Sequence, residues 1–234
     1  MGNFFLHRMT SSDLRESRKR IFLVDDHPLV REWLGHLINR QTDLTVCGEA
    51  GSASEAVREI RRHAPDAVVV DISLGGSSGI ELITEIKLAF PKVAVLVLSM
   101  HEESTYVERA LRAGALGYVA KRETTTKIVS AIRQVLRGEY FLSGPLALAM
   151  TRKFVQTPKR DSLSPAERLS NRELEIFGML GRGFETRRVA EELHISMKTV
   201  QAYCARIKEK LHLNSATELL REAILWDQRD KGTG

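Results

Sequence analysis

Residues 21–26 read Ile-Phe-Leu-Val-Asp-Asp, an apolar run that ends in two carboxylates. Residues 67–71 repeat this arrangement as Ala-Val-Val-Val-Asp, after a helical pattern at residues 53–63. Short apolar runs that alternate with helical patterns are typical of βαβ units, in which helices cover both faces of a parallel sheet. Residues 21–26 therefore predict the first strand of an α/β domain.

The same alternation continues to residue 140. We expect strands at residues 21–24, 44–49, 67–70, 94–98 and 117–120. We expect helices at residues 28–40, 53–63, 79–90, 105–113 and 125–137. Pro28 then lies at the first helical position, where a missing amide hydrogen is tolerated. The predicted fold class is α/β, with a (βα)5 doubly wound parallel sheet of the flavodoxin-like type.

The pattern changes after residue 140, where Gly144, Pro145 and Pro158 interrupt it. Residues 170–173, Ser-Asn-Arg-Glu, then have the spacing of a capping box that opens a helix. Four helices are expected, at residues 171–180, 186–193, 197–211 and 216–226. The chain is thus expected to contain a basic N-terminal extension (1–20), the α/β domain (21–140), a linker (141–165), a smaller all-α domain (166–228) and a tail (229–234).

The composition is that of an ordinary globular chain. Of the 234 residues, 43% are hydrophobic and 28% are charged, which argues against a mostly disordered or membrane-embedded protein. No run approaches the roughly 18 apolar residues that span a bilayer, and residues 1–20 lack the apolar core of a signal peptide. We therefore expect a cytoplasmic protein. The two cysteines, Cys47 and Cys204, predict neither a disulfide framework nor a zinc site.

Charged and polar residues end several of the predicted strands. Asp25 and Asp26 follow the first strand, Asp71 the third, Ser99 the fourth and Lys121 the fifth. In a doubly wound sheet these ends meet at one edge, where ligands bind. Three carboxylates there would repel each other unless a hard divalent cation such as Mg²⁺ neutralised them. A lysine and a hydroxyl can stabilise a transferring phosphoryl group, which leaves one carboxylate as nucleophile.

Each of these residues also has an ordinary structural interpretation. An Asp that precedes a helix is commonly an N-cap, which applies to Asp25 and Asp26. Asp71 can be a turn residue before a glycine-rich loop, and Lys121 a solvated surface charge. Taken together, however, four strand ends that each deliver a matching group favour one shared site.

Residues 21–140 resemble the receiver domain of bacterial two-component response regulators. Residues 24–31, Val-Asp-Asp-His-Pro-Leu-Val-Arg, resemble the NarL/FixJ subfamily in particular. The resemblance implies that Asp71 is the phosphoacceptor and takes a phosphoryl group from a sensor histidine kinase. It also implies a Mg²⁺ site, with Asp26 and Asp71 as direct ligands, Asp25 acting through water, and the backbone carbonyl of Ser73.

The same resemblance implies a switch. Lys121 would pair with the phosphoryl group, Ser99 would move to hydrogen-bond it, and Tyr118 would swing inward in step. Two positions depart from the family pattern: Gly75 stands where proline is frequent, and Arg122 stands where many receivers have a cis-proline. The glycine-rich loop leaves the lifetime of the phosphoryl group open.

The predicted helix at residues 197–211 has two faces. Its buried stripe consists of Val200, Cys204, Ile207 and Leu211, so Cys204 is expected in the core. The opposite face carries Lys198, Gln201, Ala202, Ala205, Arg206 and Glu209. This pattern fits the recognition helix of a helix-turn-helix domain, and it equally fits an ordinary helical bundle with a solvated face.

Residues 169–226 resemble the LuxR-type helix-turn-helix, through residues 170–173, 189–193, 195–200 and 210–211. The resemblance implies that the domain binds double-stranded promoter DNA. By position, Gln201, Ala202 and Ala205 would face bases, and Lys198, Thr199 and Arg206 would hold phosphates. Glutamine can pair with adenine and alanine can touch a thymine methyl group, so base readout is expected to be modest and the affinity salt-dependent.

The last predicted helix carries Leu219, Leu220, Ala223 and Ile224. This set is too apolar for the edge of a small domain unless it covers the core or meets a partner. In the resembled family this helix dimerises on DNA, so we expect a homodimer when the protein is phosphorylated or DNA-bound.

These features together predict a phosphorylation-controlled DNA-binding regulator, which is a switch rather than a turnover enzyme. The alternative is a phosphorylation-independent regulator whose receiver serves for docking or dimerisation. The intact set of Asp25, Asp26, Asp71, Ser99 and Lys121 argues against that alternative.

Overall fold

The computed structural model describes residues 18–74, 77–100, 104–123, 125–144, 147–148 and 165–232. Most of the expected N-terminal extension and linker, and the loop position Gly75, therefore lie outside the described residues. Among the described helices, none is both long enough and apolar enough to cross a membrane.

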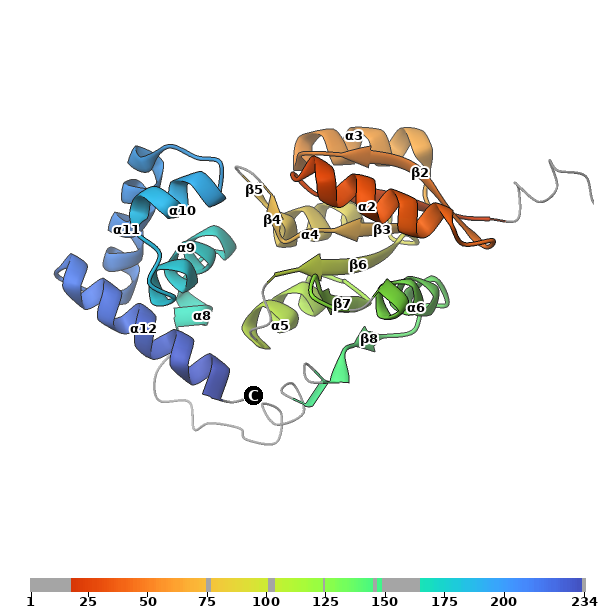
Figure 1. Ribbon diagram of the computed structural model, residues 1–234. Helices are drawn as coiled ribbons and strands as arrows, with labels where there is room; N and C mark the ends of the chain where they lie inside the picture. Colours follow the sequence, from red (N-terminus) through yellow and green to blue (C-terminus); the bar gives the residue numbers. More distant parts are fainter. Residues whose placement is uncertain are drawn as a thin grey trace, which may run out of the picture.

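A six-stranded parallel sheet forms the first half of the molecule (Figure 1). Its strand order is β2-β1-β3-β6-β7-β8, so the first five strands have the order expected of a doubly wound sheet. The strands are β1 (Lys19–Val24), β2 (Leu44–Ala50), β3 (Ala67–Val70), β6 (Ala94–Ser99), β7 (Gly117–Ala120) and β8 (Phe141–Leu142). The predicted α/β fold class is confirmed.

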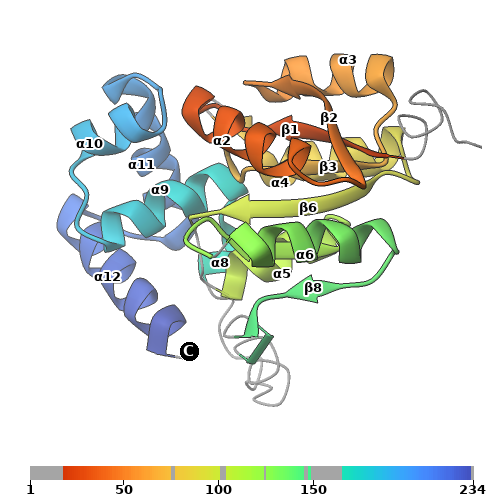
Figure 2. The same cartoon turned by 45° about the vertical axis from the view of Figure 1, so that its right-hand side comes forward.

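Helices cover both faces of this sheet (Figure 2). They are α2 (Pro28–Asn39), α3 (Ala53–His63), α4 (Gly79–Ala89), α5 (Ser104–Arg112) and α6 (Thr125–Leu136). Alternate residues of each strand point to opposite faces, so Leu23 packs with α2 and α6, while Phe22 packs in the cluster that holds α3, α4 and α5. Double coverage explains why β3 and β6 are buried along their whole length and are apolar up to Ser99 at the end of β6.

The sheet and its connections differ from the prediction in two places. Phe141 and Leu142, expected in the linker, form the short edge strand β8, which pairs in parallel with β7. A two-residue strand is too short to produce a periodic signal. The segment after Asp71 also contains an antiparallel pair, β4 (Ser73–Leu74) and β5 (Ser77–Ser78), where the sequence predicts only a loop.

The second half is helical, with α8 (Pro165–Arg168), α9 (Asn171–Gly181), α10 (Thr186–Glu192), α11 (Met197–Leu211) and α12 (Ala216–Gly232). The predicted capping box is present at the start of α9: the Ser170 hydroxyl accepts from the Glu173 amide, and the Glu173 carboxylate accepts from the Ser170 amide. Ser196 caps α11 by accepting from the amide of Thr199 at 3.0 Å. The four expected helices are confirmed, and α8 is additional.

Helix α12 covers the core of this half. Leu219 and Ala223 are buried, whereas Leu220 remains 44% exposed. The close approach of α12 to α9 depends on Gly181, because a Cβ atom there would lie 2.4 Å from the carbonyl oxygen of Ala223. The apolar set of α12 is thus used mainly inside its own domain.

We predict that Gly181→Ala lowers the free energy of unfolding by about 1–3 kcal/mol, because backbone must move to admit the methyl group. Gly35→Ala is the matched control. A Cβ atom at this helical position meets nothing within 4 Å, so the control is expected to gain about 0.5–1 kcal/mol. Urea unfolding measures both, and an equal effect of the two substitutions would contradict the packing described for α9 and α12.

Candidate functional site

The carboxyl end of β1 supplies two aspartates. Asp25 is 2% exposed, and its carboxylate accepts from the backbone amide of His27 at 2.9 Å. Its carbonyl accepts from the Arg31 guanidinium at 2.6 Å, which ties the strand end to α2. Asp26 lies beside the His27 ring, with 2.8 Å between Oδ1 and Nδ1. The strand end therefore presents both carboxylates at the same edge of the sheet.

The end of β3 places Asp71 next to them. Its amide donates to the carbonyl of Val24 at 2.8 Å, so the sheet hydrogen bonding itself brings Asp71 beside the end of β1. The side chain is 4% exposed and accepts from the amide of Ser73 at 3.3 Å. Asp71 is therefore a nearly buried carboxylate at the edge of the sheet.

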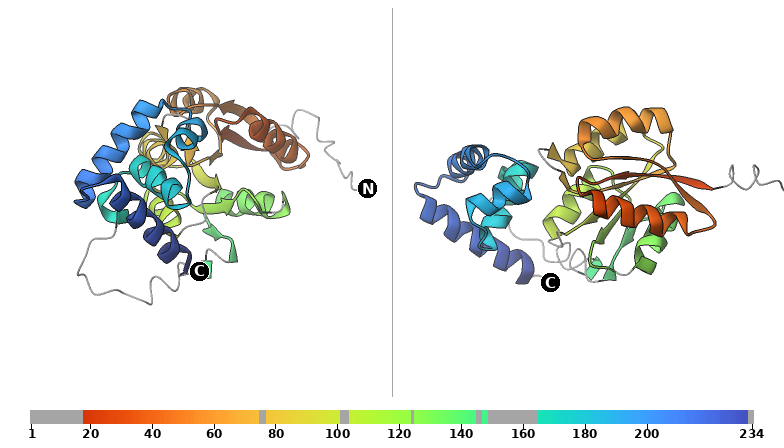
Figure 3. Two further views of the ribbon diagram at one scale, coloured as in Figure 1. Left: turned by 60° about the vertical axis from the view of Figure 1, so that its left-hand side comes forward. Right: turned by 45° about the horizontal axis from the view of Figure 1, so that its top comes forward.

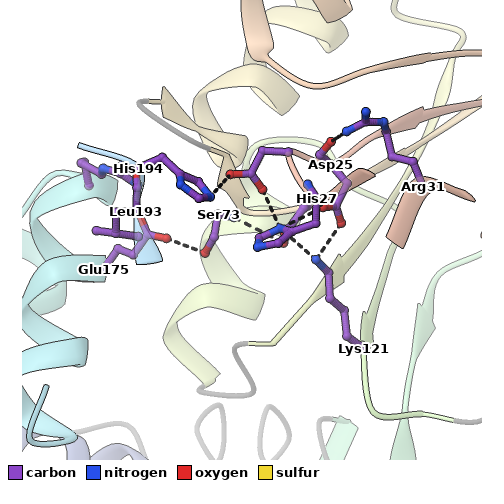
Figure 4. Close-up of polar contacts among 11 residues, drawn as sticks. Asp25, His27, Arg31, Ser73, Lys121, Glu175, Leu193 and His194 are labelled. Carbon is purple, nitrogen blue, oxygen red and sulfur yellow. Dashed lines mark hydrogen bonds and ion pairs between the residues drawn. The ribbon is translucent and has the colours of Figure 1, made fainter. Parts of the chain in front are cut away.

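Lys121 joins the two strand ends (Figure 4). Its Nζ atom donates to Asp25 Oδ2 at 2.6 Å and to Asp71 Oδ2 at 2.7 Å. The lysine is positioned by its amide, which donates to the carbonyl of Ser99 at 2.8 Å. The structure thus brings together Asp25, Asp26, Asp71 and Lys121, as predicted, with Ser99 alongside.

Burial sets the electrostatics of this cluster. Desolvation raises the pKa of the Asp71 carboxyl to about 6; Lys121 opposes the rise and Asp25 adds to it. For Lys121, desolvation lowers the pKa, but the two carboxylates outweigh it and hold the pKa above its ordinary value. Ionisation of the buried Asp71 carboxyl therefore costs free energy, and a bound cation would offset that cost.

The donor set suits a hard cation. Asp25, Asp26, His27 and Asp71 each offer a ligand atom within 4.8 Å of one another. Three of these residues are carboxylates, and oxygen ligands are those that Mg²⁺ prefers. The acidic cluster thus fits a Mg²⁺ ion.

His27 and two residues of the helical half were missed by the sequence analysis. His27 directly follows both aspartates, so its position next to the site was readable from adjacency. Glu175 contacts Ser73, and His194 lies 3.7 Å from Asp26. These two contacts join the halves of the chain, and nothing in the sequence pattern indicated which helices face the sheet edge.

Two further predicted residues lie in the sheet beside the site. Ser99 at the end of β6 and Tyr118 in β7 are both fully buried. Tyr118 pairs in register with Val97, and Ser99 with Ala120. The structure thus places Ser99 at the same edge of the sheet as Asp71, and Tyr118 further inside β7. Their movement on phosphorylation stays a prediction.

The predicted DNA-contact residues share one face of α11. The whole set is exposed: Lys198, Thr199, Gln201, Ala202, Ala205 and Arg206. The opposite stripe faces inward, with Val200 and Ile207 buried and Cys204 and Leu211 half-buried. Burial raises the pKa of the Cys204 thiol, which agrees with the expected packing role. The two-faced helix predicted from the sequence is confirmed.

Comparisons with known proteins match both halves. The family described as "Response regulator receiver domain" matches residues 21–133, and the family described as "Bacterial regulatory proteins, luxR family" matches residues 167–223. The oxygen regulatory protein NreC of Staphylococcus carnosus is 34% identical over 209 residues, which are 88% of this chain and 96% of that protein. The chain belongs to the two-component response regulators.

Solved structures place this response regulator with the same group. A two-component response regulator of the LuxR family from Aurantimonas sp. is 38% identical, with a TM-score of 0.58 over 60% of this chain and 100% of that one. RcsB from Salmonella enterica serovar Typhimurium, solved bound to the promoter P1flhDC with the phosphomimetic BeF3−, has a TM-score of 0.58 at 22% identity over 88% of this chain and 98% of that one. The second similarity shows the fold alone. The NarL/FixJ resemblance is confirmed.

We predict that Asp71→Asn stabilises this response regulator without metal, by about 1–3 kcal/mol at pH 7. The pKa of Asp71 is raised from 3.8 to about 6, so the folded state binds this proton more tightly than the unfolded state does. The stabilisation from the bound proton is fully present below pH 4 and is lost as the pH rises through 6. Urea unfolding in EDTA at pH 7 measures the difference in unfolding free energy between Asp71→Asn and the wild type. This difference is expected to become smaller below pH 6.

Asp43→Asn is the control for that substitution. Its hydrogen bond from Arg133 lowers the pKa of Asp43, so removing this charge is not expected to stabilise the fold. Adding Mg²⁺ is expected to stabilise the wild type and not Asp71→Asn. Equal stabilisation of both by Mg²⁺ would contradict a cation site that includes Asp71.

Proposed function

We propose that this response regulator is a phosphorylation-controlled DNA-binding switch in the cytoplasm, with Asp71 as the phosphoacceptor and a sensor histidine kinase as the donor. The observation that carries the proposal is the buried Asp71 carboxylate, held by Lys121 within a cluster of acidic ligands. We also propose that it is not a turnover enzyme, since its chemistry is confined to its own phosphorylation and dephosphorylation.

The residues of the site have distinct tasks in this proposal. An Asp71 oxygen attacks the phosphorus of the kinase phosphohistidine; the P–O bond forms as the P–N bond breaks, and the histidine leaves. Mg²⁺, held by Asp26, Asp71 and the carbonyl of Ser73, with Asp25 acting through water, would neutralise the phosphoryl oxygens. Lys121 leaves Asp71 Oδ2 to pair with the phosphoryl group.

The second part of the switch lies in the sheet. The hydroxyl of Ser99 hydrogen-bonds the new phosphoryl group, and Tyr118 accompanies this shift. These movements reach α5, which follows Ser99 in the chain and on which the helical half rests through Arg109. The exposed face of α11 then binds promoter DNA, and exposed α12 residues such as Leu220 form the homodimer.

Intact-mass measurement tests the acceptor. With Mg²⁺ and a small-molecule phosphodonor, the wild type is expected to gain one phosphoryl group and Asp71→Ala none. Lys121→Ala is expected to slow the reaction by about 10²-fold, because a preorganised positive charge is lost. Lys127→Ala, which removes an exposed lysine paired with Glu123, is the matched control. No adduct on the wild type, even after a rapid quench, would favour the phosphorylation-independent alternative.

A DNA titration tests the output. Arg206→Ala is expected to weaken binding by a similar factor for all sequences, and to reduce the salt slope by about 1, because a phosphate contact is lost. Arg58→Ala, an exposed arginine on α3, is the control and is expected to bind as the wild type does. The same titration is expected to give two copies per operator. Unchanged affinity in Arg206→Ala would contradict the docking proposed for α11.

A further inference from the structure

The helical half of the response regulator lies against the carboxyl edge of the sheet (Figure 3). Ser73, two residues after the phosphoacceptor, donates its hydroxyl hydrogen to Glu175 Oε1 of α9 at 2.5 Å. His194, between α10 and α11, places Nε2 at 3.7 Å from Asp26 Oδ2, and its ring lies 6.0 Å from that of His27. The DNA-binding half therefore contacts both sides of the acidic cluster.

A second contact lies on α5. Arg109 donates to Asn171 Oδ1 at 2.5 Å and to the carbonyl of Leu169 at 2.7 Å. Burial at this contact lowers the pKa of Arg109. Tyr106 is fully buried, and its hydroxyl lies 3.4 Å from the position of a Cβ atom on Gly178 of α9. Helix α9 thus touches both the loop after Asp71 and the helix that follows Ser99.

Glu175 continues the first contact into the helix-turn-helix. Its second oxygen accepts from Arg172 Nη1 at 2.6 Å, and Arg172 Nη2 donates to the carbonyl of Leu193 at 3.0 Å. Leu193 is the C-cap of α10, at the turn before α11. Glu175 is 2% exposed and Arg172 is 5% exposed, so this chain of hydrogen bonds is shielded from water. Ser73, Glu175, Arg172 and Leu193 form what we call the polar relay, of which Figure 4 labels Ser73, Glu175 and Leu193.

We propose that the polar relay couples the state of Asp71 to the helix-turn-helix, with Glu175 as a positioning residue for the loop that holds Ser73. This inference rests on the phosphorylation proposed above. In the docked form Glu175 holds the Ser73 hydroxyl, and His194 lies against Asp26. A cation held by Asp26 would compete with His194 for that carboxylate. A phosphoryl group on Asp71 would add negative charge near the Glu175 carboxylate that holds Ser73, so both contacts are weakened when the site is loaded.

The coupling acts in both directions. If binding of a cation or phosphoryl group at the site weakens docking of the helical half by a given factor, docking weakens that binding by the same factor, because the two equilibria are linked. The predicted DNA-contact residues of α11, such as Gln201 and Arg206, are exposed in the docked form. The relay therefore controls the helix-turn-helix through its turn and its attachment to the receiver, and not by covering the base-facing residues.

Hydrogen exchange of Ser73→Ala tests the relay. This variant removes the receiver side of the contact and leaves the Arg172–Glu175 pair intact, so the helical half is expected to keep its fold. Without metal or phosphodonor, the amides of residues 171–181 and 193–195 are expected to exchange about tenfold faster than in the wild type, because a hydrogen bond to a charged group is lost. Ser130→Ala, at an exposed position of α6, is the matched control and is expected to exchange as the wild type does.

A second readout separates positioning from simple packing. If docking restrains the loop after Asp71, Ser73→Ala is expected to bind Mg²⁺ several-fold more tightly and to be phosphorylated faster by a small-molecule donor. Equal exchange and equal Mg²⁺ affinity in Ser73→Ala and Ser130→Ala would overturn the relay. The exchange comparison uses no donor, so it still decides on the relay if the wild type fails to take a phosphoryl group.

Discussion

The ammonium group of Lys121 bridges the carboxylates of Asp25 and Asp71, and the arrangement at the sheet edge depends on this buried charge balance. Without the lysine, two carboxylates that are nearly inaccessible to water would face each other at the ends of neighbouring strands. With the lysine present, its charge stabilises both carboxylates, although burial still makes ionisation of Asp71 unfavourable. In the proposed function, a cation and a phosphoryl group change that charge balance, and this change is the signal that the site responds to.

The fold was predictable because its determinants are local. The apolar runs that end in Asp25 and Asp71 define strands buried on both faces, and parallel pairing then brings the strand ends together without further information. The capping box at Ser170 and Glu173 was readable for the same reason. The edge strand β8 was missed, since two residues carry no periodicity.

The contacts between the halves could not be predicted in this way. Ser73 and Glu175 are 102 residues apart, and the hydrogen bond between them follows from how the two halves of the chain meet. A buried glutamate on α9 looks, in sequence, like one more charged residue on a helix. The polar relay links this glutamate to the carbonyl of Leu193, at the turn before α11. In the proposed relay, α9 therefore contacts both the loop after Asp71 and the turn before α11.

The most direct test of this account is the distance between the two halves, measured by pulsed electron paramagnetic resonance. Spin labels on Arg58→Cys in α3 and Arg187→Cys in α10, in a background without Cys47 and Cys204, report it. The account predicts one narrow distance for the unphosphorylated protein, and a longer, broader distribution after phosphorylation with Mg²⁺. The same narrow distribution in a fully phosphorylated sample would contradict the claim that the state of Asp71 controls the attachment of the DNA-binding half.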